Sequence, residues 1–319
     1  MPELPDVTVY VERLADLLVG RTLRHVRIRS PFLLRTVEPP LSAAEGRTIA
    51  GVRRMGKRIV LELRAAGTQP AAASAEPLFL VLHLMIAGRL KWGAPDAGIP
   101  GKIGLAAFDV DDGTLLLTEA GSKKRASLHL LAGEAALAAH DRGGLEVMEA
   151  SAADFAAVLR RENHTLKRAL TDPRLLSGIG NAYSDEILHR ARLSPFIQTG
   201  TMSDEQFAAL LAATRAVLGE WTARLREEAV ADARAGHALP RKVTAFRPGM
   251  AVHGRYGQPC PVCGAPVQRI LYAENEANYC AKCQTGGKLL ADRVLSRLMK
   301  DDWPRTLEEL EERKREGRG

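Results

Sequence analysis

Residues 260–283, CPVCGAPVQRILYAENEANYCAKC, contain all four cysteines of a chain of 319 residues. The cysteines form two C-x2-C pairs, Cys260 with Cys263 and Cys280 with Cys283, at the spacing of a four-thiolate zinc site. Each tight pair lets two thiolates converge on one ion, so we expect a single structural Zn²⁺ in tetrahedral coordination. Two disulfides are the alternative, and a reducing compartment disfavours them. A closed set of four thiolates leaves no open position, so the metal would have no catalytic role.

The region upstream of this finger changes from strand-like to helix-like periodicity near residues 143–144. From 21 to about 131, short apolar runs are separated by turn residues, a pattern typical of a β-sandwich or barrel. From 151 to 230 the apolar spacing is helical, and Ser203 with Gln206 forms a capping box ahead of the longest helix. The sequence therefore predicts a β-rich first part and a helical second part.

A further helix is predicted over residues 6–19, where Val7, Leu14 and Leu18 share one helical face and Gly20 follows as a C-terminal cap. The fold class is therefore α+β. It combines an N-terminal β-sandwich and its leading helix with a C-terminal helical domain and the four-cysteine finger.

The composition is that of a globular protein with a basic tilt. Lys and Arg number 45 against 38 Asp and Glu, giving a net charge of +7, and 46% of residues are hydrophobic, which excludes wholesale disorder. No apolar stretch approaches the ~18–20 residues that cross a bilayer. The start, with Pro2 and Glu3, is unlike a secretory signal. We expect a cytoplasmic protein without a membrane partner, and the positive excess is a weak indication of a polyanionic partner.

Four features together resemble one protein family. They are the start Met-Pro-Glu-Leu-Pro-Asp-Val, the pair Gly56-Lys57 before a strand, the run GIGNAYSDE at 178–186, and the finger. In order and spacing over residues 1–285 the chain is similar to the Fpg/Nei DNA glycosylases, the formamidopyrimidine-DNA glycosylase and endonuclease VIII family. The resemblance implies a bifunctional DNA glycosylase and AP lyase, a nucleoid-associated monomer that excises damaged bases from DNA.

This resemblance gives each segment of the chain an expected role. The segments are residues 1–140, the catalytic β-sandwich domain; 141–252, a helix-two-turn-helix DNA-binding domain; 253–285, the zinc finger; and 286–319, a C-terminal helical extension. Leu289, Leu290 and Leu298 have helix-like spacing in the extension, for which a solvated helical tail is the favoured interpretation.

The amino terminus is the expected nucleophile. Once Met1 is removed, Pro2 becomes a terminal secondary amine, and α-amines titrate near pH ~7.7–8.0, against ~10.4 for lysine. Such an amine can attack a sugar C1′ and form an iminium that releases the base and acidifies C2′. By resemblance, Glu3 is the acid/base group and Lys57 contacts phosphate and assists elimination. An uncleaved Met1 would turn the Pro2 nitrogen into an unreactive amide.

The resemblance also carries over four supporting positions. Asn181 matches the phosphate ligand of the helix-two-turn-helix, where a helix N-terminus presents free N–H groups. Lys167 matches a basic DNA-binding position, and Glu186 matches a carboxylate that supports the active-site network. Asp6 stands where the family usually has Glu.

The side chains that fill the void left by a flipped nucleotide depart from the family pattern. Ile86 occupies the usual Met position with Met85 beside it, and either residue could fill the void. Arg125 keeps the Arg role, whereas Ala126 replaces the Phe wedge. Asn275 stands where the family finger has an Arg that aids the second elimination. We therefore expect a divergent member that prefers single-stranded, gapped or bulky-lesion DNA to 8-oxoguanine in intact duplex.

Two other functions remain open at this point. A non-catalytic or specialised binder of damaged or single-stranded DNA would have the same fold with diverged reading loops. A zinc-ribbon RNA-binding protein would explain the finger and charge but not the MPELP start. The preferred lesion, the opposite base and the choice between β- and β,δ-elimination depend on tertiary structure.

Overall fold

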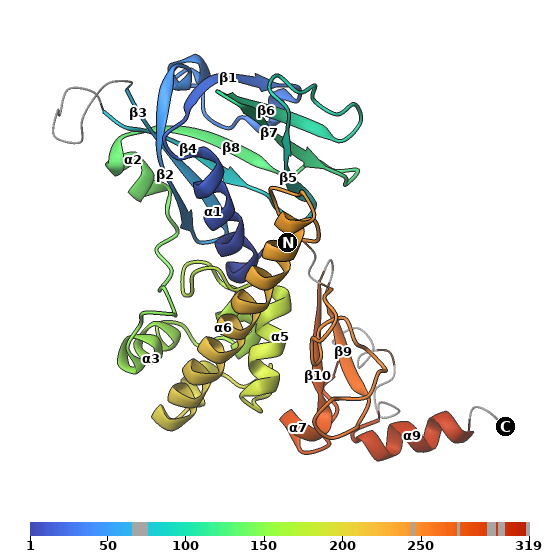
Figure 1. Ribbon diagram of the computed structural model, residues 1–319. Helices are drawn as coiled ribbons and strands as arrows, with labels where there is room; N and C mark the ends of the chain where they lie inside the picture. Colours follow the sequence, from blue (N-terminus) through green and yellow to red (C-terminus); the bar gives the residue numbers. More distant parts are fainter. Residues whose placement is uncertain (66–75, 244–245, 273–274, 292–297, 299–303, 317–319) are drawn as a thin grey trace. The chain divides into compact units, whose positions relative to one another are not determined.

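A computed structural model describes residues 1–65, 76–243, 246–272, 275–291, 298 and 304–316 (Figure 1). The chain divides into two compact units. Unit 1 comprises Met1–Gly143 and Gly219–Thr244, and unit 2 comprises Gly144–Leu218 and Ala245–Gly319. No helix within the described ranges is long and apolar enough to cross a membrane.

Unit 1 begins with helix α1 (Leu4–Leu18), followed by a β-sheet and helix α2 (Gly133–His140). The strands are β1 (Thr22–Ile28), β2 (Arg47–Met55), β3 (Arg58–Arg64), β4 (Leu78–His83), β5 (Gly88–Gly93), β6 (Gly104–Val110), β7 (Gly113–Glu119) and β8 (Ser127–Ala132). Two short 3-10 helices, η1 (Pro31–Leu33) and η2 (Leu41–Ala44), lie between β1 and β2.

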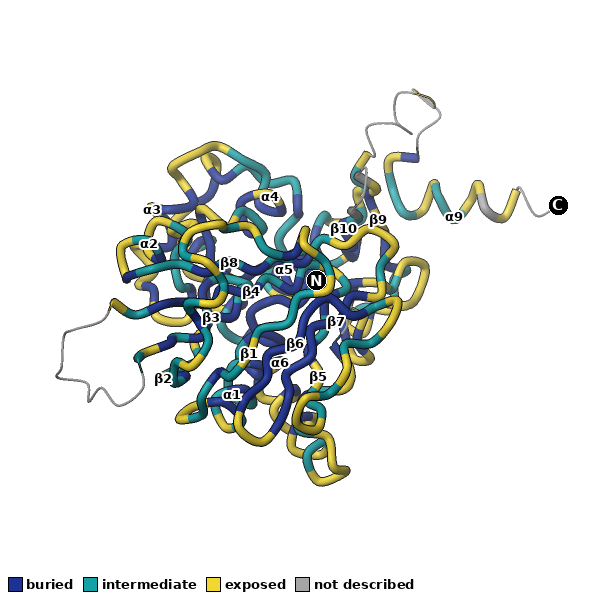
Figure 2. Tube along the Cα trace, turned by 90° about the horizontal axis from the view of Figure 1, so that it is seen from above, coloured by how far each residue is buried: buried dark blue, intermediate teal, exposed yellow. Residues whose placement is uncertain are grey.

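The strands form one antiparallel sheet in the order β5-β7-β6-β1-β2-β3-β4-β8. Only two residue pairs join β1 to β2, so the sheet separates into two four-stranded halves. Phe108 and Leu117 from one half share a buried cluster with Leu61 and Leu80 from the other. The strands therefore enclose one core as a sandwich, with β6 and β7 buried along their whole length (Figure 2).

Helix α1 closes this core with the apolar face expected from its sequence. Val7, Tyr10, Leu14 and Leu18 are all buried in the cluster that the strands form. Gly20 follows the helix with φ +86°, a left-handed conformation that glycine adopts at little cost. The helix thus ends where the sequence predicts.

Unit 2 contains the helices α3 (Ala152–Arg160), α4 (Leu166–Thr171), α5 (Asn181–Arg190) and the long α6 (Asp204–Arg234), with a 3-10 helix η3 (Thr199–Thr201). The finger consists of β9 (Val267–Tyr272), β10 (Asn275–Cys280) and α7 (Ala281–Thr285), and helix α9 (Leu307–Glu316) lies near the C-terminus. Ser203 N–H donates to Gln206 Oε1 at 3.0 Å, which confirms the predicted capping box at the start of α6.

Helix α6 contributes to both units. Its residues from Gly219 onward belong to unit 1, where Leu225 and Ala229 pack against Val9 of α1. Arg226 of α6 and Glu12 of α1 form an ion pair with an N–O distance of 2.6 Å. The second half of the helix therefore covers the outer side of α1.

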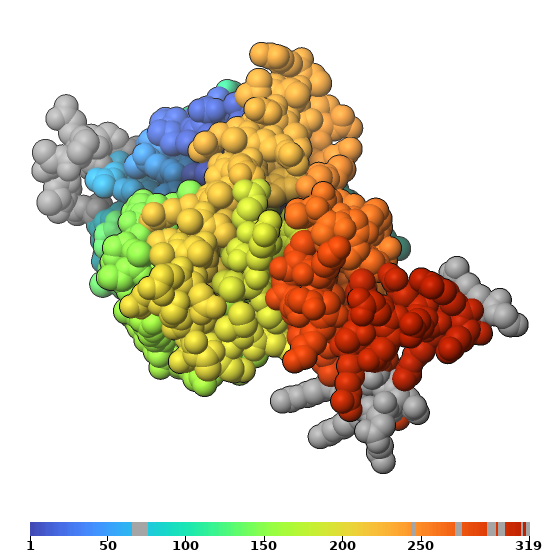
Figure 3. All heavy atoms as spheres, turned by 90° about the horizontal axis from the view of Figure 1, so that it is seen from below, coloured from blue at the N-terminus to red at the C-terminus, as the bar shows by residue number. Residues whose placement is uncertain are grey.

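The α+β class, the sandwich and the finger confirm the sequence prediction. Strand β5 was not predicted, although its buried and exposed residues alternate along most of its length. The solvated tail is wrong for part of the extension, because Leu289, Leu290 and Leu307 pack against Ile270 and Tyr279 of the finger. Figure 3 shows the C-terminal segment, in red, beside the orange residues of the finger. Part of the helix predicted there, at 292–297, lies outside the described residues.

Candidate functional site

The first candidate site, in unit 1, is the amino-terminal end of α1. Pro2 is buried, and Glu3 is only 2% exposed just before the helix begins. The backbone N–H of Glu3 donates to Asp6 Oδ2 at 3.0 Å. Asp6 is thus long enough to cap the first turn of the helix, although Glu is usual at this position. The cap fixes the direction in which the chain enters α1 and so positions Pro2 and Glu3.

Lys57 lies in a two-residue turn that joins β2 to β3. Gly56 precedes it with φ +60°, a conformation that suits the first central position of a tight hairpin turn. Burial lowers the pKa of Lys57, and the nearby Glu3 carboxylate opposes this shift. The structure therefore brings Lys57 and Glu3 within electrostatic range, as the sequence prediction of a shared site requires.

The terminal amine lies among the same charges. Burial lowers the pKa of the Met1 amino group; Glu3 and Asp6 oppose the shift, whereas Arg89 and Lys57 add to it. A lowered pKa increases the unprotonated, nucleophilic fraction of an amine at neutral pH. Removal of Met1 would transfer the amine to Pro2, one residue closer to Glu3. The arrangement can therefore combine an amine nucleophile, a carboxylic acid and a partly desolvated ammonium.

The turn between β4 and β5 carries the two candidate void-filling side chains. Met85 has a left-handed φ of +52° and is half-buried, whereas Ile86 is 56% exposed. Arg89 Nη1 donates to the carbonyl of Ile86 at 3.1 Å. A Cβ on Gly88 would lie 2.2 Å from the Leu84 carbonyl oxygen, so this tight turn requires glycine. The turn presents Ile86 rather than Met85.

The loop after β7 is closed by a buried carboxylate. Glu119 accepts hydrogen bonds from the backbone N–H groups of Arg125 (3.0 Å) and Ala126 (3.1 Å). Lys124 Nζ also donates to the carbonyl of Glu119. Ala126 is 3% exposed and belongs to the main core of unit 1. The position that would hold the wedge is therefore part of the core, and only Arg125 remains partly exposed.

A second candidate site, described by itself, lies in unit 2 at the start of α5. Gly178, with φ +81°, turns the chain into the helix, and Asn181 is its first residue. Asn181 Nδ2 donates to the carbonyl of Glu276 in the finger at 2.9 Å. Asn181 therefore joins the start of α5 to the second strand of the finger.

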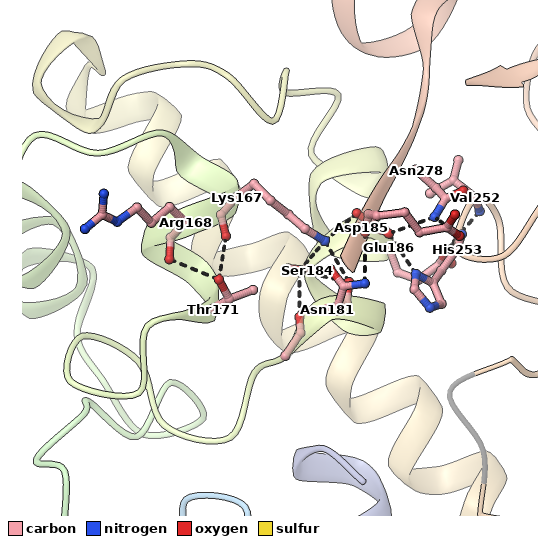
Figure 4. Close-up of polar contacts among 12 residues, drawn as sticks. Lys167, Arg168, Thr171, Asn181, Ser184, Asp185, Glu186, Val252, His253 and Asn278 are labelled. Carbon is pink, nitrogen blue, oxygen red and sulfur yellow. Dashed lines mark hydrogen bonds and ion pairs between the residues drawn. The ribbon is translucent and has the colours of Figure 1, made fainter. Parts of the chain in front are cut away.

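Lys167 contacts α5, and this residue is only 8% exposed (Figure 4). Its ammonium donates to the carbonyl of Asn181 (2.7 Å) and to Ser184 Oγ (2.8 Å). It also forms an ion pair with Asp185 Oδ1 at 2.5 Å. The side chain of Lys167 thus orders the residue that begins the helix, and its contact with DNA stays a prediction.

Asp185 and Glu186 anchor the other side of α5. Asp185 Oδ2 is 2.7 Å from His253 Nδ1 and 3.4 Å from Asn278 Nδ2. Glu186 accepts three backbone N–H groups, from Ala251 (2.7 Å) and from Val252 and His253 (2.9 Å each). Figure 4 shows these groups converging on the helix. Glu186 therefore holds the segment that leads into the finger, and its support of the active-site network stays a prediction.

The four cysteines fit a zinc ion. Their Sγ atoms all lie within 4.8 Å of one another, with Cys260–Cys283 at 3.9 Å and Cys263–Cys280 at 3.4 Å. A tetrahedron with Zn–S bonds of ~2.3 Å has edges of about 3.8 Å. Burial raises the pKa of Cys283 to about 11 and also raises that of Cys280. These two thiols therefore need a bound cation to exist as thiolates at neutral pH.

His189 contacts this centre from α5. Its Nε2 lies 3.3 Å from Cys260 Sγ, and its side chain is buried. Burial lowers the pKa of His189, and Arg190 and Arg192 lower it further. The helix that begins with Asn181 is therefore bonded to a cysteine near its end.

The sequence interpretation missed His189, His253, Asn278, Arg89 and Glu119. Each acts through a contact with a residue distant along the chain or within an irregular loop. The sequence signal available for His189 was helical spacing, because it lies four residues after Asp185 and eight after Asn181. No comparable signal marks Asn278, whose role depends on the pairing of β9 with β10.

Three protein-family models match successive parts of the chain. Residues 1–126 match the formamidopyrimidine-DNA glycosylase N-terminal domain, 145–228 its H2TH domain, and 257–286 the zinc finger found in FPG and IleRS. A formamidopyrimidine-DNA glycosylase of Thermus thermophilus is 34% identical over 295 residues, covering 90% of this chain and 100% of that protein. An uncharacterized formamidopyrimidine-DNA glycosylase-like protein of Mycobacterium tuberculosis is 40% identical over 157 residues, 49% of this chain and 94% of its own length.

Solved structures agree with this match. The crystal structure of the MutM (Fpg) protein from Thermus thermophilus has a TM-score of 0.69 and 32% identity, covering 89% of this chain and 98% of that one. Lactococcus lactis Fpg with abasic-site DNA has a TM-score of 0.74 at 22% identity, over 89% of this chain and 99% of that one, and so supports the fold alone. Among these four relatives, the three long alignments leave about a tenth of this chain unmatched.

Proposed function

We propose that this chain, which belongs to the formamidopyrimidine-DNA glycosylase family, is a DNA-repair glycosylase that removes damaged bases and then cleaves the strand at the abasic site. The observation that carries the proposal is the desolvated terminal amine beside Glu3 and Lys57 in unit 1. Such a cluster of buried, oppositely charged groups is typical of a catalytic site. The enzyme would work as a monomer on nucleoid DNA.

The reaction would begin at Pro2 after removal of Met1. The nitrogen lone pair attacks C1′ of the damaged nucleotide, the N-glycosidic bond breaks, and the base leaves with the bonding electrons. Loss of the amine proton and opening of the sugar ring give an iminium ion at C1′. The iminium acidifies C2′, so loss of a C2′ proton expels the 3′ phosphate. Excision and strand cleavage then share one intermediate.

Glu3 and Lys57 would divide the proton transfers. Glu3 protonates the deoxyribose ring oxygen as the ring opens, which is general acid catalysis at short range. Lys57, with a lowered pKa, contacts phosphate and assists the elimination. Asp6 would act through the helix cap that orients Glu3.

Unit 2 would bind the DNA backbone. Asn181 at the start of α5 would receive a phosphate, and Lys167, which donates to the Asn181 carbonyl, would hold this residue in position. Zinc bound by the four thiolates would supply folding energy to the finger and no reaction chemistry. Arg125, at the loop closed by Glu119, would add a further backbone contact.

The β4–β5 turn and the loop after β7 favour substrates whose damaged base leaves the helix without an inserted aromatic side chain. Ile86 would fill the void left by the flipped nucleotide, because its side chain is 56% exposed at the turn, whereas Met85 is half-buried. Ala126 lies in the core and cannot serve as a wedge. We therefore propose that single-stranded or gapped DNA is processed at least as well as intact duplex. Release of one lesion from both substrates tests this, and a strong duplex preference would contradict it.

The finger favours a single elimination. Asn275 occupies the position of the expected Arg, and Arg269 has its guanidinium over the Tyr256 ring, 4.3 Å from the centroid. Arg269 also lies 3.9 Å from Glu276 Oε2. With this cation already engaged, we propose β-elimination as the main strand cleavage, which end-group analysis of the cleaved oligonucleotide would reveal.

Sodium borohydride trapping on an abasic-site oligonucleotide tests the central proposal. The protein without Met1 should give a covalent adduct, and a fixed N-terminal extension, which makes the Pro2 nitrogen an amide, should abolish it. Pro2→Gly should give less adduct, because its terminal amine is primary. If protein without Met1 binds abasic DNA but gives no adduct, the chain is a non-catalytic binder of damaged DNA.

A further inference from the structure

The helix α5 is bonded to the finger along a single stripe. Asn181, Asp185 and His189 follow one another at intervals of four residues, so they lie on one face of the helix. Asn181 Nδ2 donates to the Glu276 carbonyl at 2.9 Å, and Asp185 Oδ2 accepts from Asn278 Nδ2 at 3.4 Å. The third member of the stripe reaches the metal-binding cysteines.

We propose that His189 is a positioning residue for the zinc centre, whose Nε2–H donates a hydrogen bond to the Cys260 thiolate. A metal-bound thiolate can only accept, so the imidazole must be the donor in this pair. The contact of 3.3 Å is buried on both sides. The proposal does not depend on the catalytic activity of unit 1.

The bond would matter because four thiolates around one Zn²⁺ leave a net negative charge in a small volume. A donor outside the ligand set spreads part of this charge and lowers the basicity of the sulfur. The backbone N–H of Cys283 already donates to Cys280 Sγ at 3.4 Å within the finger. His189 is the corresponding donor from outside the finger, and it therefore retains the metal and attaches α5 to Cys260 at the same time.

The chain offers a matched set of substitutions at this position. His189→Phe keeps a planar ring and removes the donor. His189→Gln places an amide N–H as many bonds from Cβ as Nε2, whereas His189→Asn places it where Nδ1 lies. Ile187→Val, on the same buried helix, removes one methylene group without touching a polar contact. The set separates the hydrogen bond from packing.

The first measurement is the rate of zinc release from the full chain into a chromogenic chelator. His189→Phe should release zinc about tenfold faster than the unaltered protein, in line with the usual effect of removing an outer hydrogen bond. His189→Gln and Ile187→Val should stay close to the unaltered rate, and His189→Asn should resemble His189→Phe. Equal zinc-release rates for His189→Phe, His189→Gln and the unaltered chain would overturn the proposal. Release that is fast to the same degree from His189→Phe and His189→Gln would also overturn it.

The second measurement reports on the sulfur itself. In the cobalt-substituted protein, loss of the N–H donor should move the thiolate-to-cobalt charge-transfer band to longer wavelength. His189→Gln should restore the band, and Ile187→Val should leave it in place. If His189→Phe fails to fold, the Gln and Asn variants still decide the matter. Identical bands for these two variants would mean that His189 acts by packing alone.

Discussion

The amino-terminal end of unit 1 and helix α5 of unit 2 both bury ionised side chains, and they treat them differently. In unit 2 the Lys167 ammonium has three oxygen partners, and the Glu186 carboxylate accepts three backbone N–H groups. In unit 1 burial lowers the pKa of Lys57 and of the terminal amine, and nearby carboxylates only partly offset it. Buried charges with many bonds build a structure, whereas desolvated charges of lowered pKa are suited to chemistry.

The largest effect should come from a substitution at the amino-terminal end of unit 1. Glu3→Gln removes the proton donor, so base excision should fall by about 10²- to 10⁴-fold. An abasic sugar equilibrates with its open-chain aldehyde, which the amine can attack without protonation of a ring oxygen by Glu3, so borohydride trapping on abasic DNA should persist. Single-turnover excision of a damaged base is the measurement.

The matched control for Glu3→Gln is Glu12→Gln, which alters an exposed ion pair further along α1. It should leave excision within about twofold, since exposed pairs contribute only ~0.2–1 kcal/mol. An undiminished excision rate in Glu3→Gln would contradict the assigned role and move Glu3 into the structural group.

Substitutions among the buried charges of unit 2 should lower its free energy of unfolding. Lys167→Met leaves Asp185 buried with its main cation removed, which should destabilise unit 2 by about 3–5 kcal/mol. Arg168→Met is the control, because the neighbouring Arg168 is exposed on the same short helix. Urea unfolding followed by circular dichroism measures both. Equal stability of the two variants would show that the buried pair contributes nothing net.

Glu186→Gln tests a single acceptor shared by three donors. The amide keeps one oxygen but places its NH₂ group against backbone N–H groups that need an acceptor, so we expect a loss of about 1–3 kcal/mol. Hydrogen exchange at residues 251–253 should quicken in the variant and not in Glu149→Gln, an exposed control. Unchanged protection at these amides would mean that other contacts hold the segment.

The smallest effect concerns acid stability in unit 1. Burial, Arg58 and Lys57 lower the pKa of His83 from 6.5 to about 4. The folded state therefore binds fewer protons than the unfolded state, and stability is lost as pH falls from about 6.5 toward about 4.

Between pH 7 and pH 5.5, this single group should cost about 1 kcal/mol of unfolding free energy. His83→Asn cannot gain the proton, so its loss of stability over the same interval should be smaller by that amount. Urea unfolding of both proteins at the two pH values is the measurement. An identical loss in both proteins would show that His83 is accessible to protons in the fold.

Local patterns predicted most of the architecture. The cysteine spacing predicted the finger, because four thiolates need two close pairs. Seven of the eight strands in the unit 1 sheet stood out as apolar runs. Strand β5 was missed because glycine at both ends and the charged Arg89 and Lys91 weaken the strand signal. Its identity as a strand depends on pairing with β7.

The site was less predictable than the fold. Pro2, Glu3 and Lys57 could be proposed by resemblance, and the structure adds the electrostatic reason for their proximity. The partners of α5 could not be proposed, because His253 and Asn278 reach Asp185 across more than sixty residues of sequence. Contacts of that range follow from packing and have no local periodicity.

In the turn between β4 and β5, one residue determines the backbone conformation and another supplies the exposed side chain. Gly88 is required because any side chain there would meet the Leu84 carbonyl, whereas the exposed Ile86 contributes its carbonyl, not its side chain, to the bond with Arg89. Selection can therefore exchange the residue at position 86 by a single codon change without rebuilding the turn. A substitution at position 86 would therefore change the side chain at the tip, whereas a substitution at Gly88 would change the turn itself.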